Sequence, residues 1–248
     1  MSPDARPATA TTAAAKKVVV RHVDRPPLDL VDRLGEVGTA TVHEAIGRRG
    51  YLGPDITPIQ QDVKLAGTAV TVSCHPGDNM MIHAAIEVCQ PGDMLVVTNT
   101  APSTHGMFGD LLATSLMARG VRGLIIDAGV RDTSDLRSMG FPVWSRWVSC
   151  EGTVKATAGA VNVPVVFGGI VIGPGDVVCA DDDGVVVVER PELESAIELS
   201  QQRLDKEEAT RKRLETGELG LDMSGLRATL ADAGVVYVDS LTELDLND

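Results

Sequence analysis

The stretch that decides the fold is GMFGDLLATSLMARGVRGLIIDAGVRD, which runs from Gly106 to Asp132. Residues Phe108 to Arg119 carry apolar side chains at helical spacing, and Gly123 to Asp127 is an apolar strand that ends at Ala128-Gly129. A further helix is expected from Thr133 to Met139. Because strands and helices alternate here, the sequence predicts a parallel sheet with crossover helices.

The alternation continues on both sides of this stretch. Toward the N-terminus, Gly67 to Ser73 predicts a strand, Asn79 to Cys89 an amphipathic helix and Met94 to Thr98 a second strand. Toward the C-terminus, Pro142 to Trp144 leads into another short strand. The region from Gly152 to Val188 differs, because its segments are short, β-branched and bounded by Gly or Pro, with no helix between them. We therefore expect a mixed α/β core with a β-only portion.

The two ends of the chain differ from this core in composition. Residues 1–16 are rich in Ala, Thr and Pro, lack the apolar run of a signal peptide and predict a disordered extension. Residues 192–216 are charged, with apolar residues at helical spacing, and predict a long solvated helix that needs a surface such as a neighbouring subunit. The expected division is an extension over 1–16, an α/β core over 17–190 and a C-terminal helical extension over 191–248.

Local signals also predict caps and turns. An interrupted helix is expected over 31–46, with Thr39 or Thr41 as the N-cap of its second part. Proline fixes φ and glycine supplies positive φ, so a Pro-Gly-Asp tripeptide predicts a turn that orients the segment after it. This tripeptide occurs three times, beginning at residues 76, 91 and 174.

Composition and charge exclude some functions. The chain has 248 residues, with 35 Asp and Glu against 22 Lys and Arg, and a formal net charge of −13. Nucleic-acid binding depends on concentrated Lys and Arg and is therefore not expected. No apolar run approaches ~18 residues, so no membrane span is expected. The cysteines show no C-x-x-C pairing, and such free thiols are typical of a cytoplasmic protein; they are Cys74, Cys89, Cys150 and Cys179.

A candidate binding site lies where the expected helix begins and the expected strand ends. Residues Gly109 to Leu112 open the helix, whose first amides have no partner within the helix and attract an anion. The strand delivers Arg131 and Asp132, and ligands of open α/β sheets bind beyond the carboxyl ends of strands. The helix start, the arginine and the carboxylates are therefore expected to share one pocket.

The residue types in this pocket suit a carboxylate ligand and a hard metal ion. Arg131 and the helix amides suit a carboxylate, because arginine offers it a bidentate fork. Asp132, with Asp110 acting through water, suits Mg²⁺ or Mn²⁺, since magnesium keeps several waters and takes one or two carboxylates. The spacing alone leaves a structural alternative open, in which Arg131 and Asp132 pair at a strand–helix turn and Asp110 is a favourable charge at a helix start.

The D-x20-R-D spacing of Asp110, Arg131 and Asp132 resembles the signature of class II pyruvate aldolases. These enzymes act on 4-hydroxy-4-methyl-2-oxoglutarate and 4-carboxy-4-hydroxy-2-oxoadipate. Further segments resemble the same family, in the same order along the chain. They are ATVHEAIGRRG (40–50), GTAVTV (67–72), PGDNMMIH (76–83), FGDLLATS (108–115), IIDAGVRD (125–132), FPVW (141–144), PGDVVCADDDGVVVV (174–188) and GELGLDM (217–223).

The resemblance implies a fold and a set of roles. The implied fold is an α/β/β/α sandwich, also used by the regulator of ribonuclease E activity, which assembles as trimers or hexamers with active sites between subunits. Asp132 would bind the metal directly, and Asp110 would hold a metal-bound water. Arg131 would contact the pyruvyl carboxylate and keto oxygen, and the amides of Leu111 and Leu112 would complete the carboxylate site.

Further roles are implied for other parts of the chain. A glutamate from the C-terminal helix of a neighbouring subunit would join the outer shell of the metal. The position of GELGLDM favours Glu207 for this role, with Glu208 as the alternative. Asn79 and His83 fall where the pocket wall is expected. Ser224-Gly225 follows GLDM where close relatives often carry an aromatic residue, which leaves the substrate preference open.

The implied reaction is the metal-dependent cleavage of a 4-hydroxy-2-oxo acid to pyruvate and a second 2-oxo acid through a pyruvate enolate, as in aromatic compound degradation. Oxaloacetate decarboxylation gives the same enolate and is expected as a side activity. A Schiff-base aldolase needs a desolvated lysine, and we expect neither Lys64 nor Lys155 in the pocket. The alternative from another class is a non-catalytic regulator that binds a ribonuclease.

Two further motifs are weaker. His105 lies in the loop before the helix and is a candidate for the pocket, although a lone histidine is functional mainly where partners orient it. Asp181-Asp182-Asp183-Gly184 lacks the spacing of a calcium loop and instead predicts a turn at a strand.

Overall fold

The computed structural model describes residues 17–243, so the expected extension over 1–16 lies outside the described residues. The chain divides into two compact units, one that ends at Gln201 and one that begins at Gln202. The first unit extends beyond residue 190 because the start of the long helix is buried: Leu193, Ala196, Ile197 and Ser200 are all at most 4% exposed.

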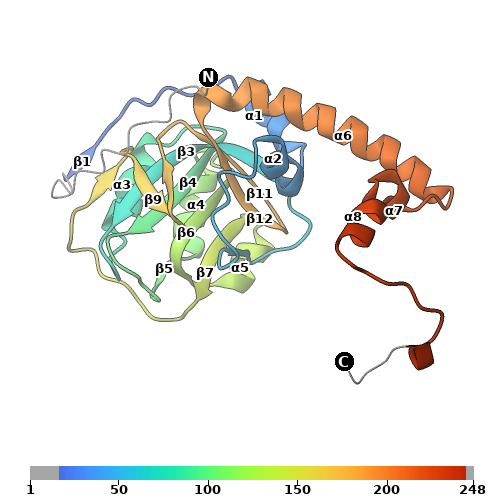
Figure 1. Cartoon of the computed structure of the whole chain (residues 1–248). Helices are drawn as coiled ribbons and strands as arrows, with labels where there is room; N and C mark the ends of the chain where they lie inside the picture. Colours follow the sequence, from blue (N-terminus) through green and yellow to red (C-terminus); the bar gives the residue numbers. More distant parts are fainter. Residues whose placement is uncertain (1–16, 244–248) are drawn as a thin grey trace. The chain divides into compact units, whose positions relative to one another are not determined.

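The first unit is built on a mixed sheet whose centre is parallel (Figure 1). Neighbouring strands β3, β4, β6 and β7 run parallel, and helices α3 (Met80–Val88), α4 (Asp110–Met117) and α5 (Thr133–Ser138) form the crossovers. The predicted parallel sheet with crossover helices is therefore confirmed. Across the sheet the order is β1 (Val18–Val19), β8 (Ala160–Val161), β3 (Leu65–Cys74), β4 (Asp93–Asn99), β6 (Gly123–Val130), β7 (Val143–Val148) and β2 (Thr57–Pro58).

The expected β-only portion is present. Strands β11 (Val177–Asp181) and β12 (Gly184–Val188) pair with each other, and β11 also pairs antiparallel with β3. Strands β9 (Val165–Phe167) and β10 (Ile170–Ile172) form a separate hairpin. The short strand β5 (Gly106–Phe108) pairs with the end of β6, immediately before α4 begins.

Alternating side chains of the central strands fill two cores. Val70 and Val72 of β3 pack with residues of α3, α4 and α5 on one face of the sheet. Ala69 of β3 and Trp144 of β7 pack with β9 to β12 on the other face. Helices α1 (Leu28–Gly35) and α2 (Thr39–Ala45) cover the β-rich side through contacts with β3, β11 and β12. The layers are therefore α/β/β/α, as expected.

Three predicted boundaries were wrong, because contacts distant in sequence fix them. Helix α2 has Gly38 at its N-cap and Thr39 as its first residue, and Asp181 supplies the capping carboxylate by accepting from the Thr39 amide (2.8 Å) and hydroxyl (2.6 Å). Phe108 belongs to β5, because it pairs with Val130, so α4 begins only at Asp110. For the same reason β6 continues beyond Ala128-Gly129 to Val130.

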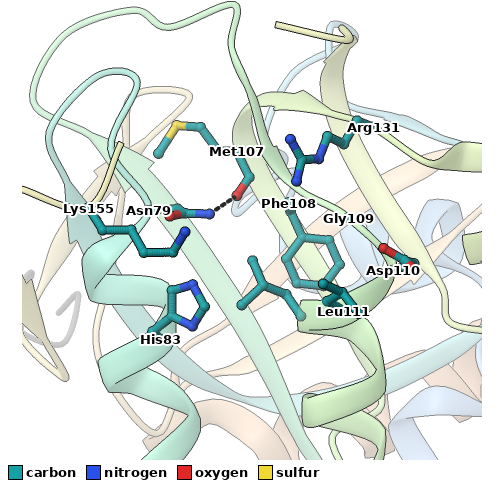
Figure 2. Close-up of a pocket in the computed structure, with 10 residues that line it drawn as sticks. Asn79, His83, Met107, Phe108, Gly109, Asp110, Leu111, Arg131 and Lys155 are labelled. Carbon is teal, nitrogen blue, oxygen red and sulfur yellow. Dashed lines mark hydrogen bonds between the residues drawn. The ribbon is translucent and has the colours of Figure 1, made fainter. Parts of the chain in front are cut away.

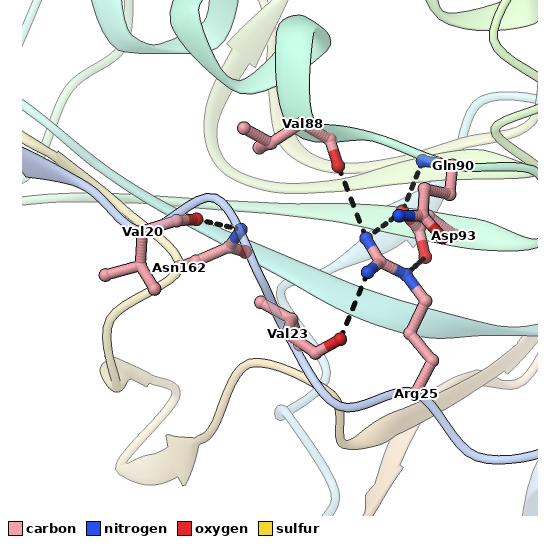
Figure 3. Close-up of polar contacts among 7 residues, drawn as sticks. All are labelled: Val20, Val23, Arg25, Val88, Gln90, Asp93 and Asn162. Atoms are coloured by element: carbon pink, nitrogen blue, oxygen red, sulfur yellow. Dashed lines mark hydrogen bonds and ion pairs between the residues drawn. The ribbon is translucent and has the colours of Figure 1, made fainter.

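The three Pro-Gly-Asp tripeptides are turns, as predicted, and each also holds a distant segment. Their glycines have φ between +70° and +91°, and their aspartates are at most 2% exposed: Asp78, Asp93 and Asp176. Figure 3 shows the second turn, where the Arg25 guanidinium donates to both carboxylate oxygens of Asp93 at 2.8 Å. Arg25 also donates to the carbonyls of Val23 and Val88. This contact fastens the N-terminal segment to the sheet.

The second unit contains the end of helix α6 (Leu193–Glu215), then α7 (Gly220–Met223) and α8 (Leu226–Asp232). The long helix expected over 192–216 is thus confirmed. Exposed ion pairs join Arg203 to Glu207, Arg213 to Glu218 and Arg227 to Asp222. Over residues 17–243, no helix combines the length and apolar character needed to cross a membrane.

Candidate functional site

A cavity of about 80 Å³ opens where β5 leads into α4 (Figure 2). Four separate segments contribute to it: the start of α3, the β5–α4 junction, the end of β6 and the loop between β7 and β8. Its lining residues are Asn79, His83, Met107, Phe108, Gly109, Asp110, Leu111, Leu112, Arg131 and Lys155. The residues expected in the pocket from the core are in this lining, except Asp132 and the weaker candidate His105.

The start of α4 forms one wall of the pocket. Gly109 is the N-cap residue, with φ −157° and ψ −168°, which is extended backbone that any residue adopts. Asp110, Leu111 and Leu112 follow in the first helical turn, whose amide groups have no acceptor within the helix. The first internal helix bond runs from the Ala113 amide to the Gly109 carbonyl. This wall therefore presents amide donors and the positive end of a helix dipole.

Arg131 and Asp132 lie beside this wall. The pairing of β5 with β6 places Arg131, whose amide donates to the Phe108 carbonyl at 2.8 Å. The Arg131 Nε lies 3.4 Å from the Asp132 Oδ2, and both side chains are partly exposed. A Cβ added at Gly109 would stand 3.1 Å from Arg131 Cγ and 3.2 Å from Asp132 Cγ. The structure therefore brings the three members of the D-x20-R-D spacing and the helix start together.

Asn79 and His83 form the opposite part of the lining, on the first turns of α3. The Asn79 side chain is buried and its Nδ2 donates to the Met107 carbonyl at 3.1 Å. Its Oδ1 finds no hydrogen-bond partner among the described residues, which leaves an acceptor for a ligand. Burial, and next the charge of Lys155, lower the pKa of His83 below its ordinary value, so the ring is neutral at pH 7.

Lys155 is a pocket residue that the sequence analysis placed elsewhere, and that expectation was wrong. It lies in the loop between β7 and β8, and Figure 2 shows its ammonium group near His83, across the pocket from Arg131. No local motif marks it, because its position depends on a contact with the distant β3–α3 turn. Lys155 is exposed, so it lacks the desolvation that a Schiff-base lysine needs. Lys64 instead donates to the Glu36 carbonyl.

His105 lies outside the pocket lining. Its Nδ1 is 3.3 Å from the Ser103 Oγ, and its Nε2 is 3.3 Å from a Glu151 carboxylate oxygen. Its ring also packs against Gly77, where an added Cβ would stand 3.1 Å from Nε2. His105 thus links its own loop to the loops that contain Gly77 and Glu151.

Two other expectations concern parts of the chain outside this lining. Glu207 lies on α6 in the second unit, where it pairs with Arg203 at 2.8 Å, and Glu208 pairs with Lys212 at 3.4 Å. The role of either glutamate at a neighbouring subunit's metal stays a prediction. Asp181, at the start of the Asp-rich turn, caps α2 and also accepts from the Asp183 amide, which agrees with the predicted turn.

The donor set fits a hard divalent cation that keeps most of its water. Within residues 17–243 there is no group of three His, Cys, Asp or Glu side chains placed to hold a metal. Magnesium is commonly held by one or two carboxylates together with waters. The partly exposed Asp132 carboxylate, with Asp110 nearby in the lining, matches that pattern.

Comparisons with known proteins identify relatives of the chain. A family model described as RraA-like: Aldolase/RraA matches residues 39–187. A protein of Halalkalibacterium halodurans named "Putative 4-hydroxy-4-methyl-2-oxoglutarate aldolase" is 26% identical over 182 residues, which cover 73% of this chain and 87% of the relative.

Two solved structures extend this comparison. Streptomyces coelicolor RraAS2, described as an unusual member of the RNase ES inhibitor RraA protein family, has a TM-score of 0.69 and 32% identity, covering 77% of this chain and 99% of that one. A Geobacillus kaustophilus structure named S-adenosylmethionine: 2-dimethylmenaquinone methyltransferase has a TM-score of 0.56 and 29% identity, covering 61% and 94%. The names of these relatives thus include enzymes and a ribonuclease inhibitor family.

Proposed function

The chain belongs to the RraA-like family, Aldolase/RraA, and from this premise we propose that it is a divalent-metal-dependent aldolase. It cleaves 4-carboxy-4-hydroxy-2-oxoadipate, 4-hydroxy-4-methyl-2-oxoglutarate or both to pyruvate and a second 2-oxo acid. The observation that carries this proposal is that the α4 start and Arg131 line one small cavity, with the Asp132 carboxylate directly beside Gly109 and Arg131.

The pyruvyl end of the substrate binds at the start of α4. The amides of Leu111 and Leu112 donate to its C1 carboxylate, and the Arg131 guanidinium contacts that carboxylate and the C2 keto oxygen. These groups are held by the helix and by the β5–β6 pairing, so they are already oriented when the substrate arrives.

The residues of the pocket stabilise charge as the C3–C4 bond breaks. A water ordered by Asp110 takes the proton of the C4 hydroxyl, the electrons of the C3–C4 bond move toward C3, and the second 2-oxo acid leaves. The negative charge spreads onto the C2 oxygen, where Arg131 stabilises it as the pyruvate enolate, which is then protonated at C3. Mg²⁺ or Mn²⁺ held by Asp132, with Asp110 acting through water, supplies Lewis-acid polarisation of the keto oxygen. Oxaloacetate gives the same enolate by losing CO₂.

The far side of the cavity receives the rest of the substrate. The free Oδ1 of Asn79 accepts from a substrate hydroxyl, and the neutral His83 ring borders the same space. Lys155 supplies a second positive charge across from Arg131, which suits the second carboxylate that both candidate substrates carry. In a trimer or hexamer, Glu207 of a neighbouring subunit, or Glu208 as the alternative, would join the outer shell of the metal.

The test is pyruvate release from the full chain with Mg²⁺ or Mn²⁺, measured side by side on both candidate substrates and oxaloacetate. Arg131→Ala is expected to abolish release, because the enolate loses its guanidinium partner. Arg137→Ala is the matched control, since Arg137 is an exposed arginine on α5 that bonds the Ile59 carbonyl. Turnover that persists in excess chelator, or in Arg131→Ala, would contradict the proposal.

A second candidate is a ribonuclease regulator that acts by protein binding. It is favoured by the 32% identity with the Streptomyces coelicolor protein of the RNase ES inhibitor family. A pull-down that finds a stoichiometric ribonuclease partner, together with no pyruvate release from any of the three substrates, would favour this function over the aldolase.

A further inference from the structure

Asp78 is a buried carboxylate next to the pocket that the proposed chemistry does not use. It lies in the turn between β3 and α3, and its side chain is 1% exposed. One carboxylate oxygen accepts from the Met80 amide at 2.9 Å, at the first residue of α3. The other accepts from the amides of Ala156 and Thr157 at 2.7 and 2.6 Å. Asp78 therefore joins the start of α3 to a loop more than seventy residues later in the chain.

The loop that Asp78 holds carries Lys155. On the N-terminal side of Lys155, the Val154 amide donates to the Gly77 carbonyl at 3.0 Å and the Val154 carbonyl accepts from the Asn79 amide at 3.1 Å. On its C-terminal side are the two amides that bond Asp78. The backbone is thus fixed on both sides of Lys155, while the Lys155 side chain itself extends into the pocket.

The same turn also places Asn79, the residue after Asp78, in the pocket lining. Burial raises the pKa of Asp78, but hydrogen bonds from Met80, Ala156 and Thr157 outweigh it and leave the pKa below its ordinary value. The carboxylate is therefore ionised at neutral pH, and charged acceptors make stronger bonds to amides than neutral ones do.

We propose that Asp78 is a positioning residue for the second carboxylate of the substrate. By bonding the loop to α3, it holds Lys155 at a fixed place opposite the start of α4, in the same turn that places Asn79. Because the loop is already ordered before the substrate arrives, substrate binding does not carry the entropic cost of ordering it. This inference rests on the proposed aldolase function, because it assigns the second-carboxylate contact of the same site to Lys155.

The chain provides a matched control in another Pro-Gly-Asp turn. Asp176 is 2% exposed, and its carboxylate accepts from the amides of Gly173 at 2.7 Å and Arg190 at 3.0 Å. None of these three residues lines the pocket. Asp176→Asn therefore reproduces the loss of a buried carboxylate clamp without touching the loop that carries Lys155.

The experiment compares Asp78→Asn, Asp176→Asn, Lys155→Met and the double variant of Asp78 and Lys155. We expect Asp78→Asn and Lys155→Met to raise the KM for the two aldol substrates about tenfold, the effect of one lost charged contact, with kcat nearly unchanged. Hydrogen–deuterium exchange at C3 of pyruvate needs only the part of the site that binds the pyruvyl group. Its rate is therefore expected to stay near the wild-type value in Asp78→Asn and Lys155→Met. Asp176→Asn is expected to leave both KM values unchanged.

The double variant separates positioning from general destabilisation. If Asp78 acts through Lys155, the double variant has the KM of Lys155→Met alone, whereas a merely structural role multiplies the two effects and also slows pyruvate exchange. Either of those last two results would overturn the proposal. If Asp78→Asn does not fold, Asp78→Ser replaces it, because serine still accepts from the Met80 amide but cannot hold the loop.

A third measurement keeps this inference distinct from the proposed function. Amide hydrogen exchange in the peptide covering residues 149–159 should speed up in Asp78→Asn and stay unchanged in Asp176→Asn. If the wild-type protein releases no pyruvate and exchanges no pyruvate hydrogen, the aldolase proposal fails, whatever the peptide shows. If the wild-type protein is active but the peptide and the KM values do not change, only the role of Asp78 is refuted.

Discussion

Gly109→Ala tests the pocket by adding one methyl group between the helix start and the carboxylate of Asp132. The backbone of Gly109 is extended, with φ −157°, so alanine brings no conformational strain. The added Cβ, however, would stand 3.2 Å from Asp132 Cγ and 3.1 Å from Arg131 Cγ, and closer still to Asp132 Oδ2. The effect of the substitution is therefore steric and confined to the site.

The size of the effect follows from these distances. Nonbonded carbons pack at about 3.5–4.0 Å, so the two side chains must move away by roughly 0.5–1 Å. A displacement of about 1 Å in an active site can cost about 100-fold in rate, and we expect a loss of that order in kcat/KM for pyruvate release. The assay couples released pyruvate to lactate dehydrogenase with saturating Mg²⁺ and follows NADH.

Gly152→Ala is the control for this substitution, since a Cβ there meets no atom within 4 Å and Gly152 does not have positive φ. Both variants are expected to melt within a few degrees of the wild-type protein. If Gly109→Ala kept kcat/KM within about threefold of the wild-type value, pyruvate release would not depend on the present positions of Asp132 and Arg131. Our assignment of the site would then be wrong.

Three further predictions address the metal, the N-terminal segment and the charge in the pocket. Excess EDTA should abolish pyruvate release and added Mg²⁺ or Mn²⁺ should restore it; unchanged release would exclude the hard-cation site. Asp93→Asn should lower the free energy of unfolding by about 3 kcal/mol in a urea titration, because it leaves the mostly buried Arg25 without its charged partner. A loss under about 1 kcal/mol would show that this contact is dispensable. The pKa of His83 is lowered in the folded protein, so the folded protein binds a proton at His83 less readily than the unfolded chain does. The free energy of unfolding should therefore decrease as the pH falls below about 6.5, the ordinary pKa of histidine. Lys155→Met should raise that pKa in an NMR titration, and no change would place the Lys155 charge away from His83.

The elements that the sequence predicted correctly are those whose pattern is local. The apolar run of β6 and the mostly apolar, β-branched run of β3 follow from burial on both faces of a sheet. The charged surface of α6 follows from its exposure. In each case the physical cause lies within ten to twenty consecutive residues, so the sequence carries it.

The elements that the sequence did not predict depend on contacts between distant residues. Asp181 caps α2 from 142 positions away, so the local search for a cap chose threonine. Lys155 enters the pocket because Asp78 holds its loop from nearly eighty positions away, and no sequence motif connects the two residues. Both aspartates were visible in the sequence as turn residues, but the segment that each one holds was not.

The site residues themselves combine both kinds of information. The D-x20-R-D spacing is local to one helix–strand unit, but by itself it left a structural alternative open. The resemblance of this and other segments to a known family singled out Asp110, Arg131 and Asp132 as candidates before the fold was known. Asp132 has φ +55°, which is costly for any residue with a side chain, although aspartate tolerates it better than most. Positive φ does not by itself mark a site, since Arg48 and Asp62 share it and do not line the cavity. At Asp132 the positive φ coincides with a close contact to Gly109, where the absence of a Cβ leaves room for the Asp132 carboxylate. These two departures from ordinary packing at one point therefore support our proposal that the Asp132 carboxylate contacts a ligand.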